Sequence, residues 1–204
     1  MSKERPILEA ALESTEVIAD VLTRGEAFAD IPFIGTAIKI CRAADAARDH
    51  AFAQKIARFV QNLENMTDDQ RSKLKGKMAG GDEQARKVGE TLFFVLERVT
   101  DLDKPLLLSQ LFLAYVDGVV SSVELRRLSQ SVDSAFADDL QMLLTAHKSP
   151  DKSDEPWMQY LVASGLTRLV AGQTYNEIGK LYYEVTPLAH KLRNAYFHGR
   201  KARH

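Results

Sequence analysis

Hydrophobic residues recur every three or four positions along most of this chain, which is the period of an amphipathic α-helix. Stretches with this pattern include residues 6–22, 82–99 and 187–197. The stretch 34–63 predicts either one bent helix or two helices that join near Arg48 and His50. Residues 106–116 are apolar nearly all round, so we expect them to form the buried central helix.

Short polar signatures mark several helix ends. Thr67 and Gln70 have the spacing of a capping box, in which two side chains bond reciprocally to backbone N–H groups. Ser121 and Glu124 repeat this spacing at a later helix start. Asp103 precedes a Lys-Pro step, so we expect its side chain to cap the central helix.

The C-terminal part has a different pattern. Residues 166–170 and 180–186 are rich in β-branched and aromatic residues and predict a hairpin with a polar tip at 171–179. Before it, a helix at 135–146 is expected to turn Phe136 inward. These patterns predict a mainly α-helical bundle of seven or eight helices with a single C-terminal β-hairpin. The expected parts are residues 1–66, a polar hinge helix at 67–84, a central bundle at 85–153, and a unit at 154–204 with a loose tail from 199.

The composition is that of a folded protein with almost balanced charge. The chain has 204 residues, 45% of them hydrophobic, and a net charge of -1. This balance excludes a protein whose whole surface is basic and binds nucleic acid, but it does not exclude a local basic patch. The single cysteine, Cys41, cannot form an internal disulfide, and no signal segment opens the chain, so we expect a cytoplasmic protein.

Asp117 and Glu124 occupy positions that match the second half of a calcium-binding EF-hand loop. The first half does not match, because Leu113 and Tyr115 stand where the first two oxygen ligands are needed. The segment 107–128 resembles the turn of tellurite-resistance TerB-like helical domains. We therefore interpret Asp117 and Glu124 as a helix-ending turn and a capping residue, with metal binding as the alternative.

A short helix at 156–164 with Trp157 and Tyr160, a two-stranded hairpin and a Thr-Pro step before the last helix follow one another near the end of the chain. This order, over residues 156–197, resembles the end of a winged-helix domain. The short helix carries no Lys or Arg, so it lacks the donors that a DNA-recognition helix uses. The resemblance therefore implies a winged-helix-like shape for protein contacts or for DNA binding.

Basic residues gather at the C-terminal end of the chain, where Lys and Arg outnumber acids from residue 154 onward. Such side chains could neutralise phosphates and would make binding salt-dependent. The alternative is a solvated helix end that the helix dipole favours. The candidates for nucleic-acid contact are Lys191, Arg193, Arg200, Lys201 and Arg203.

The stretch 27–47 is the most membrane-like part of the chain, although its charged residues make crossing a bilayer costly. Either an interfacial helix binds a membrane surface here, or the apolar stripe belongs to the protein core. The membrane candidates are Phe33, Ile34 and Ile38 in the lipid, with Lys39 and Arg42 at the headgroups.

Common catalytic motifs are absent from the sequence. The chain lacks the glycine-rich phosphate loops, the serine elbow and the paired-histidine zinc motif. Nothing ties His50 or His147 to an acid and a nucleophile, and Cys41 lies on an apolar stripe. We therefore expect a protein that is not an enzyme and has no cofactor.

Four short patterns, at 31–35, 48–56, 101–105 and 164–186, follow one another along the chain. In this order they resemble small helical proteins of bacteria and their phages. The resemblance implies a bacterial or mobile-element origin and a phage-conflict setting, but no activity.

The leading expectation is a non-enzymatic interaction or regulatory protein that binds a macromolecular partner, with a protein as the first choice. Aromatic side chains carry much of the energy of protein interfaces. The expected contact residues are Trp157, Tyr160, Gln173, Tyr175 and Ile178. Nucleic-acid binding through the basic end and membrane binding through residues 33–41 are the alternatives, and the oligomeric state stays undetermined.

Overall fold

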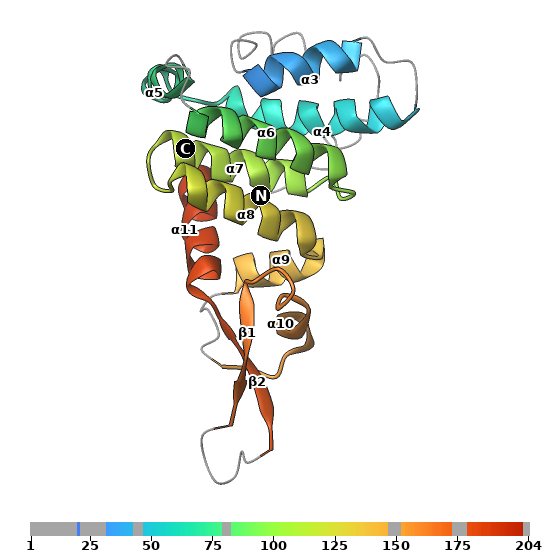
Figure 1. The fold of residues 1–204 in the computed structure, drawn as a ribbon, viewed down its shortest axis with the longest axis vertical. Helices are drawn as coiled ribbons and strands as arrows, with labels where there is room; N and C mark the ends of the chain where they lie inside the picture. Colours follow the sequence, from blue (N-terminus) through green and yellow to red (C-terminus); the bar gives the residue numbers. More distant parts are fainter. Residues whose placement is uncertain are drawn as a thin grey trace.

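The computed structural model describes Asp20 and residues 32–42, 47–78, 83–146, 152–172 and 179–201. These residues form nine helices and one two-stranded antiparallel hairpin (Figure 1). The mainly helical class with a single C-terminal hairpin is therefore confirmed, although the described residues form nine helices and not the seven or eight expected. Apart from Asp20, the expected helix at 6–22 lies outside the described residues.

Helix α7 (Lys104–Val116) is the centre of the fold, and all its residues except Leu106 are buried. This confirms the expectation from its apolar sequence. The helices α4 (Ala47–Leu63), α8 (Ser122–Ser134) and α11 (Pro187–Lys201) pack around α7 (Figure 1). One hydrophobic core includes side chains from all the described helices except α10 (Pro156–Tyr160), whose Trp157 packs against it. The expected division of the chain into four parts stays a prediction.

Aromatic rings connect α3 (Pro32–Arg42) to this core. The ring of Phe33 lies 5.8 Å from that of Phe59 and 5.9 Å from that of Phe112, edge to face in both pairs. Edge-to-face geometry is one of the preferred arrangements of aromatic pairs. The helices α3 and α4 are separate elements, and Arg48 and His50, near which their joint was expected, both lie within α4.

Both expected capping boxes are confirmed. Before α5 (Asp68–Met78), the N–H of Thr67 donates to Oε1 of Gln70 at 3.1 Å, and the N–H of Gln70 donates to the Thr67 hydroxyl at 3.2 Å. Before α8, the N–H of Ser121 donates to the Glu124 carboxylate at 2.8 Å, and the N–H of Glu124 donates to the Ser121 hydroxyl at 3.3 Å.

Two local expectations are wrong. The Asp103 side chain makes no capping hydrogen bond, and the N–H of Asp103 instead donates to the Asp101 carboxylate at 2.7 Å. Phe136 is 65% exposed, not inward. The helix α9 (Ala137–Thr145) starts after Phe136, so this residue has an extended backbone and lies outside the helical pattern used to place it.

Helix α6 (Glu83–Arg98) precedes α7 in the chain. The C-terminal unit comes after α9, and its last helix, α11, packs against α7. Helix α10 (Pro156–Tyr160) is shorter than the expected helix at 156–164, because turns follow it up to Gly165, whose φ is +73°. Strand β1 (Thr167–Ala171) then pairs with β2 (Leu181–Val185). Helix α11 is longer than expected and includes residues 199–201, which were expected to be loose.

Candidate functional site

The hairpin projects from the helical body (Figure 1). Thr167, Leu169 and Leu181 lie on one of its faces, as the pairing register shows. Thr167 is 2% exposed and its hydroxyl donates to the Met158 carbonyl, which holds the base of the hairpin against α10. Leu169 and Leu181 are 50% and 58% exposed. The outer part of this face is therefore an apolar surface in contact with solvent.

The outer edge of β1 is not paired with another strand among the described residues. The N–H of Gly172 donates to the Lys180 carbonyl at 3.0 Å, which fixes the alternation of bonded and non-bonded pairs. In that alternation, the N–H and C=O groups of Leu169 and Ala171 point away from β2. The outer edge of β2, by contrast, is already bridged to Ser153.

The structure places two of the predicted contact residues, Trp157 and Tyr160, on α10, which packs against both strands. Tyr160 is 65% exposed, whereas Trp157 is partly buried against the core. The other three predicted residues, Gln173, Tyr175 and Ile178, lie outside the described residues. We call the outer edge of β1, together with Tyr160, Leu169 and Leu181, the hairpin surface.

Two of the predicted nucleic-acid contacts have partners within the protein. Lys191 forms an ion pair with Glu124. The Arg193 guanidinium donates to the carbonyls of Leu143 and Ala146, the latter at 2.7 Å, at the end of α9. Burial lowers the pKa of Arg193. The remaining candidates are Arg200, which is exposed, and Lys201 and Arg203, whose side chains lie outside the described residues.

The apolar membrane candidates belong to the core. Phe33, Ile34 and Ile38 are 6%, 1% and 3% exposed, so none of them is available to a lipid surface in this fold. Lys39 is exposed, and the side chain of Arg42 lies outside the described residues. Within the ranges that the structure describes, no helix combines the length and apolarity needed to cross a membrane.

Asp117 joins α7 to α5 and α11. Its Oδ2 atom lies 2.8 Å from Nε2 of Gln70 and 2.8 Å from Nε2 of His198, and its Oδ1 atom lies 3.6 Å from Nζ of Lys73. Burial raises the pKa of this carboxyl, but the hydrogen bonds from His198 and Gln70, with the charges of His198 and Lys73, outweigh burial and lower it. Asp117 and Glu124 thus have side-chain partners, and the described residues contain no cluster suited to a metal ion.

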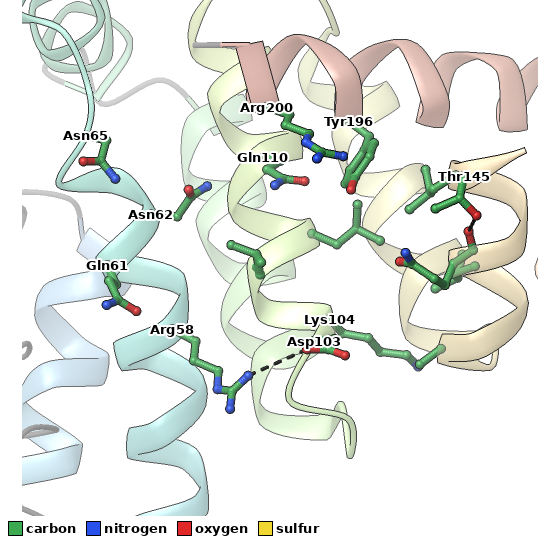
Figure 2. Close-up of a pocket in the computed structure, with 16 residues that line it drawn as sticks. Arg58, Gln61, Asn62, Asn65, Asp103, Lys104, Gln110, Thr145, Tyr196 and Arg200 are labelled. Atoms are coloured by element: carbon green, nitrogen blue, oxygen red, sulfur yellow. Dashed lines mark hydrogen bonds and ion pairs between the residues drawn. The ribbon is translucent and has the colours of Figure 1, made fainter. Parts of the chain in front are cut away.

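A cavity of about 650 Å³ lies between α4, α7, α9 and α11 (Figure 2). Its lining includes three cationic side chains, those of Arg58, Lys104 and Arg200, against one carboxylate, that of Asp103. No sequence pattern predicts this site, because its residues come from helices that are distant in the chain. The lining is also rich in amides, from Gln61, Asn62, Asn65, Gln110 and Gln141.

Two buried polar atoms of this lining have no hydrogen-bond partner in the described part of the chain. They are Oε1 of Gln110, a residue that is 3% exposed, and Nε of Arg58. Another nitrogen of Arg58, Nη1, donates to the Leu102 carbonyl at 3.1 Å. The buried Lys104 ammonium donates to the Asp133 carbonyl at 3.0 Å; burial lowers its pKa, against the opposite effect of Asp133.

No protein-family model, curated protein or solved structure matches this chain. The resemblances to TerB-like domains, to winged-helix domains and to helical proteins of bacteria and phages therefore stay predictions.

Proposed function

We propose that this chain is a non-enzymatic binding protein whose hairpin surface captures an extended segment of a partner protein. The observation that carries this proposal is the unpaired outer edge of β1, next to exposed apolar side chains on the same hairpin. A strand added there would bond to the outward backbone groups of Leu169 and Ala171. Unprotected strand edges are sites where another chain can pair.

The chemistry of the hairpin favours a peptide with alternating apolar residues. Arg168 on the other face forms an ion pair with Glu184, so this pair brings no net charge to the hairpin. Leu169 on β1 is exposed, and a strand added to β1 with apolar residues at every second position would place some of them beside it. Tyr160 on α10 and Leu181 on β2 add exposed apolar surface to the same unit. The main chain would supply affinity, and the side chains would supply selectivity.

Selection from a random-peptide library against the purified protein tests this proposal. We expect the selected peptides to have apolar residues at alternate positions. Ala171→Pro removes an N–H group that points away from β2, a substitution that an edge strand tolerates. We expect Ala171→Pro and Leu169→Glu each to weaken the affinity for a labelled selected peptide at least about tenfold, as measured by fluorescence polarisation.

Phe94→Ala is the matched control, because Phe94 is 57% exposed on α6, away from the hairpin. This variant should bind the same peptide as tightly as the unmodified protein does. Circular dichroism of all three variants checks that they are folded. Unchanged affinity in both hairpin variants, or no selected peptide, would show that β1 does not accept a strand.

A further inference from the structure

We propose that the cavity between α4, α7, α9 and α11 binds a phosphorylated small molecule, of the class that includes nucleoside monophosphates and sugar phosphates. This site is separate from the hairpin surface and goes beyond the capture of a protein partner. Its volume of about 650 Å³ lies within the range of small-molecule sites.

The charge of the lining matches a phosphate ester. Arg58, Lys104 and Arg200 against Asp103 leave an excess of two positive charges among the lining residues. The Asp103 carboxylate is 80% exposed and lies 3.7 Å from Nη1 of Arg58. Solvent therefore screens its attraction to Arg58, and the positive charge of Arg58 is only weakly neutralised. A phosphate monoester carries a charge of about −1.5 to −2 at neutral pH.

The two unpartnered polar atoms favour an organic phosphate over a bare anion. Oε1 of Gln110 is an acceptor, which an inorganic phosphate dianion satisfies poorly and a hydroxyl or amino group satisfies well. Nε of Arg58 is a donor that needs an oxygen or nitrogen acceptor. Buried groups of this kind are normally paired, so a ligand with both functions would complete the site.

The arrangement of the side chains shows how such a ligand would lie (Figure 2). Arg58 and Lys104 lie beside Asp103, whereas Arg200 lies beside Tyr196 and Gln110. The Arg200 guanidinium is exposed and has no partner among the described residues, so it supplies the direct contact to the phosphate. The body of the ligand would then lie across the amides, with Arg58 and Lys104 adding positive potential.

Calorimetric titration with a panel of nucleoside monophosphates and sugar phosphates at low salt tests the proposal. We expect at least one ester to bind, and its parent nucleoside or sugar without phosphate to bind at least about tenfold more weakly. Arg200→Gln should weaken the bound ester by a similar factor. Arg127→Gln is the matched control, because Arg127 is an exposed cation on α8 that does not line the cavity.

The absence of binding for every ester would overturn the proposal, as would equal affinities of the two arginine variants. Inorganic phosphate that binds as tightly as the esters would reduce the cavity to a simple anion site, and the organic ligand would be refuted. The hairpin variant Ala171→Pro should bind the ester as the unmodified protein does. The two proposals can therefore fail independently of each other.

Discussion

The Asp117 carboxylate, at the end of α7, contacts α5 and α11 through hydrogen bonds and ion pairs in which it is the negatively charged partner. Hydrogen bonds to a charged group contribute more to stability than neutral ones, and a donor left without its acceptor costs free energy. Gln70 is 5% exposed, so its amide has little water to replace Asp117 as a partner. A neutral Asn at this position keeps one oxygen acceptor but loses the charge that attracts His198 and Lys73.

We expect Asp117→Asn to lower the free energy of unfolding at neutral pH by about 1–3 kcal/mol. Folding lowers the pKa of Asp117 below its ordinary value of 3.8, so the carboxylate stabilises the folded protein fully at pH values above 3.8. This contribution is lost as the pH falls through the lowered pKa. Urea unfolding from neutral pH to about pH 3 should therefore show a smaller acid loss for the variant than for the unmodified protein.

Asp69→Asn is the control for this experiment, since Asp69 is 71% exposed and pairs with the same Lys73. Exposed pairs contribute little, so its effect should stay below about 1 kcal/mol. If Asp117→Asn lost stability in acid as steeply as the unmodified protein does, the acid sensitivity would come from other carboxyl groups.

The two capping boxes, whose partners are close in sequence, could be predicted, whereas contacts between distant residues could not. The capping boxes at Thr67 and Ser121 were found because each joins residues three positions apart. Arg58, Lys104 and Arg200 line the cavity from three different helices. Their positions in the sequence follow no regular spacing that would predict this proximity. One signal was present, since Gln110 is a polar residue in the middle of an apolar helix.

At the scale of elements, close packing of α11 on α7 depends on Gly199. A Cβ added at Gly199 would lie 2.4 Å from the Gln110 carbonyl oxygen, which is backbone and cannot move aside alone. The close approach explains why a glycine stands inside α11, although an isolated glycine in a sequence favours a helix end. The need for this glycine comes from a tertiary contact, which the sequence pattern could not show.

We expect Gly199→Ala to destabilise the protein by about 1–3 kcal/mol, because α11 must shift away from α7. Gly76→Ala is a matched control within a helix, since an added Cβ at Gly76 has no atom within 4 Å. That control should stabilise the protein by about 0.5–1 kcal/mol through helix propensity. Thermal and urea unfolding measure both effects, and equal shifts in the two variants would refute the close contact at Gly199.

At the scale of the whole molecule, periodicity was enough to predict the fold class but not how the parts combine. The apolar stretch at 106–116 could be recognised as the centre because nearly every position is hydrophobic. Leu161 and Leu166, beyond the expected boundary at 154, belong to the same core as Phe33. The helix that follows the hairpin also returns to α7. These contacts favour one cooperative unit over separate parts.

The only tryptophan of the chain, Trp157, can report whether the C-terminal unit unfolds with the rest. It packs against the core on α10, whereas far-ultraviolet circular dichroism reports mainly the helices of the body. We expect the fluorescence and dichroism transitions in urea to coincide, as they do for a single cooperative unit. Gly76→Ala should move both transitions together. A fluorescence transition at lower urea would mean that the unit from residue 154 onward unfolds first, and the shared core would then contribute little to holding it.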